Sequence, residues 1–182
     1  MKNINKSLKL VALAALIGFI GAPAALANFE TLGHQVTVTV PEVLTITADT
    51  SAFTLTFADN VSGSETDTKT VVYTVESNDM GQADGTAAIN ANLDNLYENV
   101  DMKAQVGTYT KISGNTELAA ANAGYVTIGT TNVAIANKDN TDVGTDGKLL
   151  NGTLPVTYKA VATADLSTGS QIHFLFVTLT TR

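Results

Sequence analysis

Regular alternation of apolar side chains with threonine is the feature that most constrains how this chain folds. From His34 to Val40 the order is His-Gln-Val-Thr-Val-Thr-Val, and Phe53 to Phe57 and Val71 to Val75 follow the same period of two. That period places one set of side chains on each face of a β-strand, and β-branched threonine fits a pleated surface with one wet face. These segments therefore predict half-buried strands.

Later segments extend the pattern along the chain. Further strands are expected at Val126 to Ile128, Val133 to Ile135, Leu154 to Ala164 and Ile172 to Thr180. Polar, glycine-containing stretches at 59–68 and 139–148 read as loops, and Asn151-Gly152 is a favoured tight-turn pair. About eight to ten short strands with turn signals between them predict an all-β, antiparallel sandwich or barrel.

Two segments have helical features within this β pattern. Leu93 to Val100 carries apolar residues at helix spacing, although the residues that lead up to Leu93 alternate as in a strand. Glu117 to Ala123 is rich in alanine and is followed by Gly124, which favours a short helix with a glycine end. We therefore expect one or two short helical turns in an otherwise β domain.

The first 27 residues have the pattern of an export signal. Three lysines precede an apolar run from Leu10 to Ile20, and Ala25 to Ala27 supplies the small residues of a cleavage site. The apolar run is too short to cross a hydrocarbon core of about 30 Å. We therefore predict cleavage before Asn28, a single domain over residues 28–182, and a secreted, cell-surface or periplasmic location.

The composition excludes several classes of partner and chemistry. The chain holds 10 basic and 17 acidic residues, and three of its lysines lie in the leader, which leaves 7 against 17 and a net charge of −10. Such a surface repels phosphate, so neither nucleic acid nor anionic lipid is expected as a partner. The sequence has no cysteine, which excludes disulfides, thiol catalysis and thiolate metal sites.

No set of residues in the sequence points to catalysis. His34 and His173 both share strand parity with apolar neighbours, which favours partly buried structural roles. The sequence contains no Gly-x-Ser-x-Gly, no helical pair of histidines and no glycine-rich phosphate loop. We therefore predict that the protein is not an enzyme and has no cofactor.

An acidic loop offers the strongest candidate for a metal. Asp139, Asp142 and Asp146 bring closely spaced oxygen ligands between glycines, as a calcium ion requires. The EF-hand spacing is absent, so a solvated hairpin loop is the stronger interpretation and no resident metal is predicted. Asp79 and Asp84 form a weaker candidate.

The last strand pattern is apolar on both faces. In Ile172 to Thr180, Phe174 and Phe176 lie on one parity and Leu175 and Val177 on the other. Such a strand requires cover on both sides, which predicts a place in the middle of a sheet or a partner that seals it. Exposed at a sheet edge it would be prone to aggregation.

The beginning of the exported domain offers a matching segment. Residues 28–40 end in the alternating Val36, Val38 and Val40, and such a segment can add as a strand to its own sheet or to that of a neighbour. Main-chain hydrogen bonds would then supply affinity, and the alternate side chains would fill pockets.

The two ends resemble those of chaperone–usher pilus subunits, in particular the cysteine-free kind. In that family a strand-forming N-terminal extension precedes a β-sandwich, and the C-terminal strand carries a glycine fourteen residues from the end, a place held here by Gly169. The family usually has an aromatic residue next to last, where this chain has Thr181. The resemblance implies an immunoglobulin-like, pilin-like sandwich, residues 28–40 as a donor strand, and an assembly chaperone as partner.

The leading functional hypothesis is therefore a structural subunit of a surface fibre or layer that self-associates through edge strands. Its assembly residues would be the three valines of the donor strand together with Gly169, Phe174 and Phe176. The alternative is a self-contained secreted or periplasmic module whose loops bind a carbohydrate, a protein or calcium. In that case the N-terminal strand would pair within its own chain.

Overall fold

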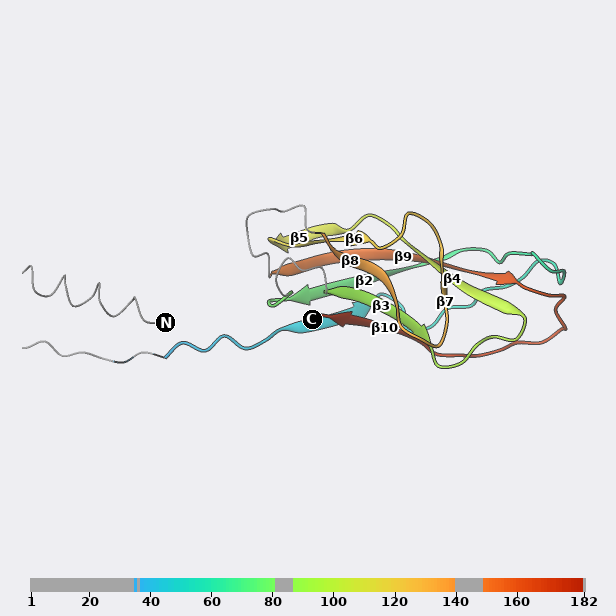
Figure 1. Ribbon diagram of the computed structural model, residues 1–182, viewed down its shortest axis with the longest axis horizontal. Coiled ribbons are helices and arrows are strands. Elements are labelled where there is room, and N and C mark those ends of the chain that lie inside the picture. The colour runs from blue at the N-terminus through green and yellow to red at the C-terminus, as the bar shows by residue number, and fades with distance from the viewer. Residues whose placement is uncertain (1–34, 36, 81–86, 140–148, 182) are drawn as a thin grey trace, which may run out of the picture. The chain divides into compact units, whose positions relative to one another are not determined.

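The computed structural model describes residues 35, 37–80, 87–139 and 149–181. The body of the molecule, from Val40 onward, is built from two antiparallel sheets, and its described residues contain no helix (Figure 1). The prediction of an all-β sandwich is therefore confirmed. Residues 1–34 lie outside the described part, and with them the predicted leader.

Within the described residues, ten strands make up the two sheets. Their bounds are β1 Leu44–Ala48, β2 Lys69–Ser77, β3 Ala88–Leu93, β4 Val100–Val106, β5 Thr110–Gly114, β6 Glu117–Ala120, β7 Val126–Ile128, β8 Val133–Asp139, β9 Leu150–Ala162 and β10 Leu175–Thr180. The larger sheet has the order β1-β2-β9-β4-β7, and β5 also pairs with β9. The smaller sheet has the order β10-β3-β8-β6.

The central element of the larger sheet is β9, with 13 residues. Every second side chain of this strand is buried, as the apolar alternation from Leu150 to Ala162 requires. One edge of β9 pairs with β2 along nine residues, and the other edge pairs first with β5 and then with β4. β9 therefore connects most strands of the larger sheet through its own hydrogen-bonded pairs with β2, β4 and β5.

Pro155 lies in the middle of β9, where a missing N–H would ordinarily break the ladder. Its carbonyl oxygen accepts a hydrogen bond from the Gly107 N–H at 2.8 Å, in the connection between β4 and β5. A strand residue directs its N–H and C=O to the same side, so the missing donor faces the gap between those two strands. The proline is tolerated there because neither β4 nor β5 pairs with that position.

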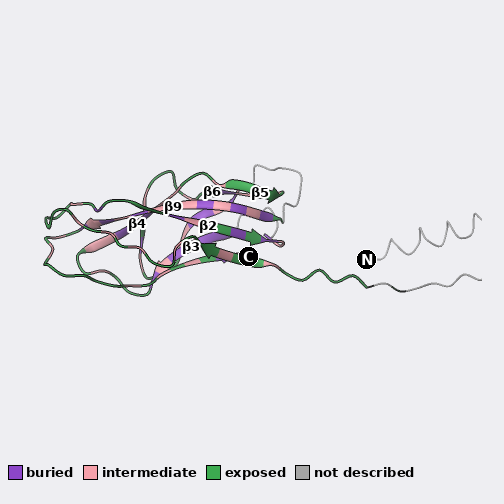
Figure 2. Ribbon diagram, turned by 180° about the vertical axis from the view of Figure 1, so that it is seen from behind, coloured by how far each residue is buried: buried purple, intermediate pink, exposed green. Residues whose placement is uncertain are grey.

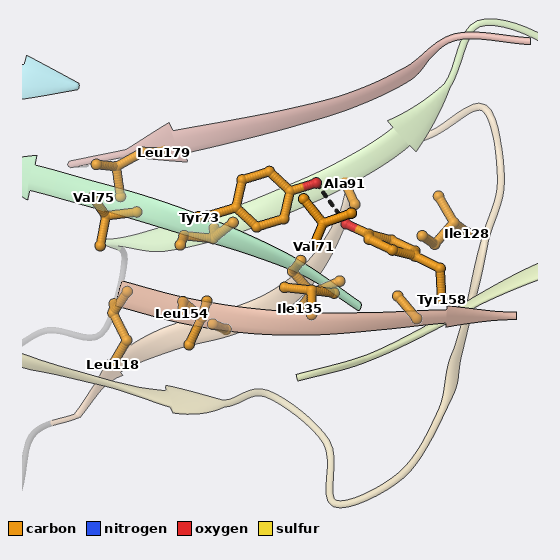
Figure 3. Close-up of a cluster of buried hydrophobic side chains, with 14 of the residues drawn as sticks. Val71, Tyr73, Val75, Ala91, Leu118, Ile128, Ile135, Leu154, Tyr158 and Leu179 are labelled. Carbon is orange, nitrogen blue, oxygen red and sulfur yellow. Dashed lines mark hydrogen bonds between the residues drawn. The ribbon is translucent and has the colours of Figure 1, made fainter. Parts of the chain in front are cut away.

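The core lies between the sheets and contains one polar pair (Figure 3). The hydroxyl groups of Tyr73 and Tyr158 form a hydrogen bond of 2.9 Å among buried aliphatic side chains. Phe53 stacks on the ring of Tyr158, with 5.2 Å between the ring centroids. Burial raises the pKa of both hydroxyls, because a charged phenolate would lose its water. The pair therefore stays neutral and satisfies its hydroxyl groups within the core.

The predicted turn at Asn151-Gly152 is wrong, since both residues lie inside β9. The glycine is needed there for a packing reason. A Cβ atom at Gly152 would collide with the phenol end of Tyr109 and come within 2.5 Å of the Thr110 backbone oxygen. A glycine needed for a close neighbour looks the same in the sequence as a glycine needed for a turn. The Asn151-Gly152 pair alone could therefore not tell a strand position from a turn.

The two predicted helical turns are also wrong. Glu117–Ala120 is the strand β6, which pairs with β8, and the residues between β3 and β4 form turns rather than a helix. Alanine propensity is a weak preference that tertiary pairing overrides. In Leu93 to Val100, the helix spacing arose because apolar residues at the end of β3, in the following loop and at the start of β4 fall three or four apart.

Several of the predicted strands do not form along their whole length. Phe53 to Phe57 makes only an isolated bridge between Phe57 and Thr66, although Phe53 and Leu55 still pack against the core. The last strand begins at Leu175 rather than Ile172. In residues 53–57 alternation thus identified the side chains that face the core, but it did not identify which backbone stretches find a ladder partner.

Truncation within β9 should show how strongly the sandwich depends on this strand. Leu154 is fully buried, and Leu154→Ala should lower the free energy of unfolding by about 2–5 kcal/mol, because it removes buried methyl groups and leaves a cavity. Thr74→Ala, on the exposed face of β2, is the matched control and should cost less than about 1 kcal/mol. Urea unfolding followed by circular dichroism measures both, and equal losses would contradict this packing.

Alkaline titration should report the buried tyrosines. Burial, and then the charge of Glu117, raises the pKa of Tyr109 to about 12. The folded state thus holds this proton more tightly than the unfolded chain, so stability should be constant below about pH 10 and fall as the pH rises toward about 12.

The variant Tyr109→Phe provides the control for that titration. The Tyr109 hydroxyl is buried, and among the described residues no partner forms a hydrogen bond of good geometry with it. Its removal should therefore cost little near neutral pH and should reduce the alkaline loss of stability. Chemical unfolding at several pH values measures both effects, and an unchanged alkaline profile would contradict the assignment.

Candidate functional site

The strand β10 lies at the edge of the smaller sheet. It pairs with β3 on one side, from Leu175 opposite Leu93 to Thr180 opposite Ala88. Within the described residues its other side has no ladder partner. The expectation that this strand lies in the middle of a sheet is therefore wrong, and the alternative, that a partner seals it, becomes the relevant one.

The two faces of β10 differ in their surroundings. Leu179 is buried, while Leu175 and Val177 pack against the core and are only partly buried. Phe176 has the opposite parity and is 49% exposed. The strand thus combines an unpaired backbone edge with apolar side chains that are not fully covered on either face.

The first strand of the larger sheet borders the same side of the sandwich. β1 is an edge strand that pairs only with β2 among the described strands, and it is in contact with β10 (Figure 1, light blue and dark red). Ile46 packs against the core, and Leu44 remains substantially exposed. We call Leu44, Ile46, Leu175 and Val177 the edge seam. These apolar side chains of the two edge strands are incompletely covered within the described structure.

The segment ahead of β1 belongs to no ladder in the described structure. Residues 37–43 are not in a strand, and nearly the whole segment is exposed (Figure 2, green). Val38 and Val40 are 81% and 76% exposed. The strand predicted over 34–40 is therefore not found at residues 35 and 37–40, while His34 and Val36 lie outside the described residues. Alternation gives a segment one apolar face, but a strand forms only where its backbone groups also find a hydrogen-bonding partner.

Asn78 fixes the point at which that segment enters β1. Its side-chain oxygen accepts the Val43 N–H at 2.8 Å, its amide nitrogen donates to the Pro41 oxygen at 2.6 Å, and its backbone N–H donates to the Val43 oxygen at 3.1 Å. Sequence reasoning missed this residue, because an asparagine after a strand reads simply as a turn signal.

The residues before β10 are held by the loop that follows β3. The Asp94 N–H donates to the Phe174 oxygen at 3.0 Å, and the Asp94 side chain accepts the Phe174 N–H at 2.9 Å. Further along, the Gln171 side chain accepts the Glu98 N–H at 2.7 Å and donates to the Glu98 oxygen at 3.2 Å. Residues 94–98 and 171–174 therefore run side by side and fix the start of β10.

His173 lies between these contacts. Its Nδ1 is 3.5 Å from Asp94 Oδ1, and its ring meets the Tyr97 ring edge-on at 4.6 Å between centroids. Burial, and then the charge of Asp94, raises the pKa of the Tyr97 hydroxyl. The predicted partly buried structural role fits this position, although His173 precedes the strand, and its partner Asp94 gave no signal in the sequence.

Gly169 lies in the connection between β9 and β10 rather than in a strand. Its φ of 156° is a value that residues with a side chain rarely adopt, and a Cβ there would meet no atom within 4 Å. Glycine at this place is therefore required by the backbone conformation, not by a close neighbour.

The metal candidates receive no support from the described residues. Asp139 ends β8, while Asp142, Asp146 and Asp84 lie outside the described part. The described ranges contain no group of three or more histidine, cysteine, aspartate or glutamate residues that could hold a metal ion. Nor do they contain a helix long and apolar enough to cross a membrane.

Comparison with known proteins leaves the site to be interpreted on its own geometry. No family model matches the chain, and neither a curated protein nor a solved structure is detectably similar to it.

The contact between Asp94 and the start of β10 can be tested by substitution. Asp94→Ala should speed hydrogen exchange at the Phe174 amide and destabilise the fold by about 1–3 kcal/mol, because it removes the acceptor of a charge-assisted hydrogen bond. Asp94→Asn keeps an acceptor oxygen and should retain most of the protection. Hydrogen exchange followed by NMR measures this order, and equal protection in both variants would contradict it.

Proposed function

We propose that this protein is an exported structural subunit that assembles into a surface fibre or layer by strand exchange, in which β10 accepts the N-terminal segment of a neighbouring copy. The observation that carries the proposal is the unpaired edge of β10 beside the incompletely buried edge seam. An edge of this kind is a template for an added strand, and soluble proteins ordinarily protect it.

The N-terminal segment has the chemistry that this edge requires. Its valines fall on one parity, so one face would meet the apolar side chains of the edge seam while the threonines remain in water. Val38 and Val40 are exposed and their backbone is in no ladder of the described chain, so little structure has to be lost before they pair elsewhere.

The assembly would be held without covalent bonds. The chain has no cysteine, so the contributions come from a row of backbone hydrogen bonds and from burial of the seam, at roughly 25 cal/mol per Å² of apolar surface. Before assembly the open strand is an aggregation hazard, and an assembly chaperone would prevent aggregation by covering β10. The predicted leader agrees with assembly outside the cytoplasm.

A peptide that copies residues 28–40 should test strand acceptance. The chain shortened to begin at Pro41 should remain folded, because the described residues before Pro41 pair with no strand, and it should bind this peptide and gain thermal stability. Circular dichroism during heating, with and without peptide, measures the shift.

A peptide with serine at Val36, Val38 and Val40 is the matched control. It keeps the length and the backbone groups but loses the apolar face, so it should give little or no shift. If the shortened chain does not fold, the N-terminal strand belongs to its own domain, and the self-contained binding module becomes the better account. If it folds and ignores the first peptide, strand exchange through β10 is wrong.

A further inference from the structure

Four large apolar side chains are exposed around the start of β10. Leu96, Ile172, Phe174 and Phe176 are 59%, 86%, 69% and 49% exposed, and we call them the junction patch. The hydrogen bonds from Asp94 to Phe174 and from Glu98 to Gln171 bring Leu96 opposite Ile172. Exposed apolar residues that gather in this way mark interaction surfaces more often than isolated ones do.

The edge seam does not account for the junction patch. Phe174 and Phe176 have the parity opposite to Leu175 and Val177, which pack toward the core. A strand added beside β10 would bury its valines on the core side and would present its threonines beside the phenylalanines. The patch therefore needs a second cover besides the accepted strand.

The direction of the accepted strand determines what that cover is. Every strand pair in the described sheets is antiparallel, and antiparallel pairing is slightly more stable per residue. A segment inserted antiparallel to β10 ends beside Leu175, where the junction patch begins. The rest of the inserting subunit then continues from that point, starting with its Val40, Pro41 and Val43.

We propose that the junction patch is the contact surface for the body of the inserting copy, next to the root of its donor strand. This inference rests on the proposed strand exchange. It adds where two consecutive subunits touch and in which direction the donor strand runs along β10. The root is suited to this contact, because Asn78 holds Pro41 and Val43 in a fixed path where the chain leaves the donor strand. The patch would thus set how firmly consecutive subunits are joined.

Assembly of the processed chain from Asn28 tests the patch. The double variant Ile172→Ser and Phe174→Ser should raise the lowest concentration that gives polymers at least about tenfold, since two apolar side chains lose their cover. Capture of a fluorescent peptide copying residues 28–40 by the same chain should stay unchanged. Val61→Ser, at a residue 59% exposed in a different loop, should assemble as the original chain does. Sedimentation and negative-stain microscopy measure assembly.

The outcomes separate the two proposals. If the double variant assembles like the original chain, or if it also loses peptide capture, the junction patch is not a separate contact and the inference is overturned while strand exchange stands. If the original chain neither polymerises nor captures the peptide, strand exchange is wrong and the inference falls with it.

Introduced cysteines provide a second measurement that does not depend on how the patch variant folds. The chain has no cysteine of its own, so a disulfide that joins the two different variants, separated from same-variant dimers by a size tag on one chain, reports the designed pair. A Thr39→Cys chain mixed with a Phe176→Cys chain should cross-link under oxidation, while the mixture with a Thr180→Cys chain should not. The reverse result would place the inserting body at the opposite end of β10 and would overturn the inference.

Discussion

The backbone edge of β10 is the constraint on which the interpretation of this molecule depends. A strand carries a donor and an acceptor at nearly every residue, and among the described residues only β3 pairs with β10, along one of its sides. The side chains of the same strand are apolar on both parities and only Leu179 is fully covered. The strand is thus integrated into the fold through one edge and remains incomplete along the other.

The contacts that stabilise the sandwich and the strand edges that lack a partner among the described residues lie in different parts of the fold. The polar pair of Tyr73 and Tyr158, the alternating burial of β9 and the accommodated Pro155 all belong to the interior of the larger sheet. The open edges of β1 and β10 lie at the rim, as the edge strands of the two sheets within the described residues. A domain built in this way can fold through its central ladders while its rim is still unpaired, and it needs no disulfide to do so.

Hydrophobic period predicted the layers of the fold and the residues of the core. Val71, Tyr73 and Val75 are buried as their alternation indicates, because period two depends only on which face meets the other sheet. The wrong predictions concerned segments in which strand formation depends on a backbone partner elsewhere in the chain. Residues 37–40 and 53–57 alternate as clearly as β2 does, yet their backbones find no ladder within the described chain, and a single sequence carries no signal for that.

The candidate site was predictable in its composition and not in its geometry. The sequence showed that Ile172 to Thr180 required cover on both faces, and this double requirement is what makes its position at an edge informative. It did not show that Asp94 and Gln171 hold the start of that strand, or that Asn78 fixes the root of the N-terminal segment, since such hydrogen bonds join residues far apart in the chain.

The hydrogen bonds of Asn78 at the start of β1, and those of Asp94 and Gln171 at the start of β10, have a consequence for any assembly through β10. A strand inserted beside a loosely held edge could slide by two residues and keep its apolar face inward, because strand period alone does not distinguish such registers. Asn78 limits the free length of the donor segment, and the Asp94 and Gln171 contacts limit movement of the acceptor at the place where the donor leaves it. Register would then be set by the roots of the two segments, and the repetitive valine and threonine pattern between them needs to supply only affinity.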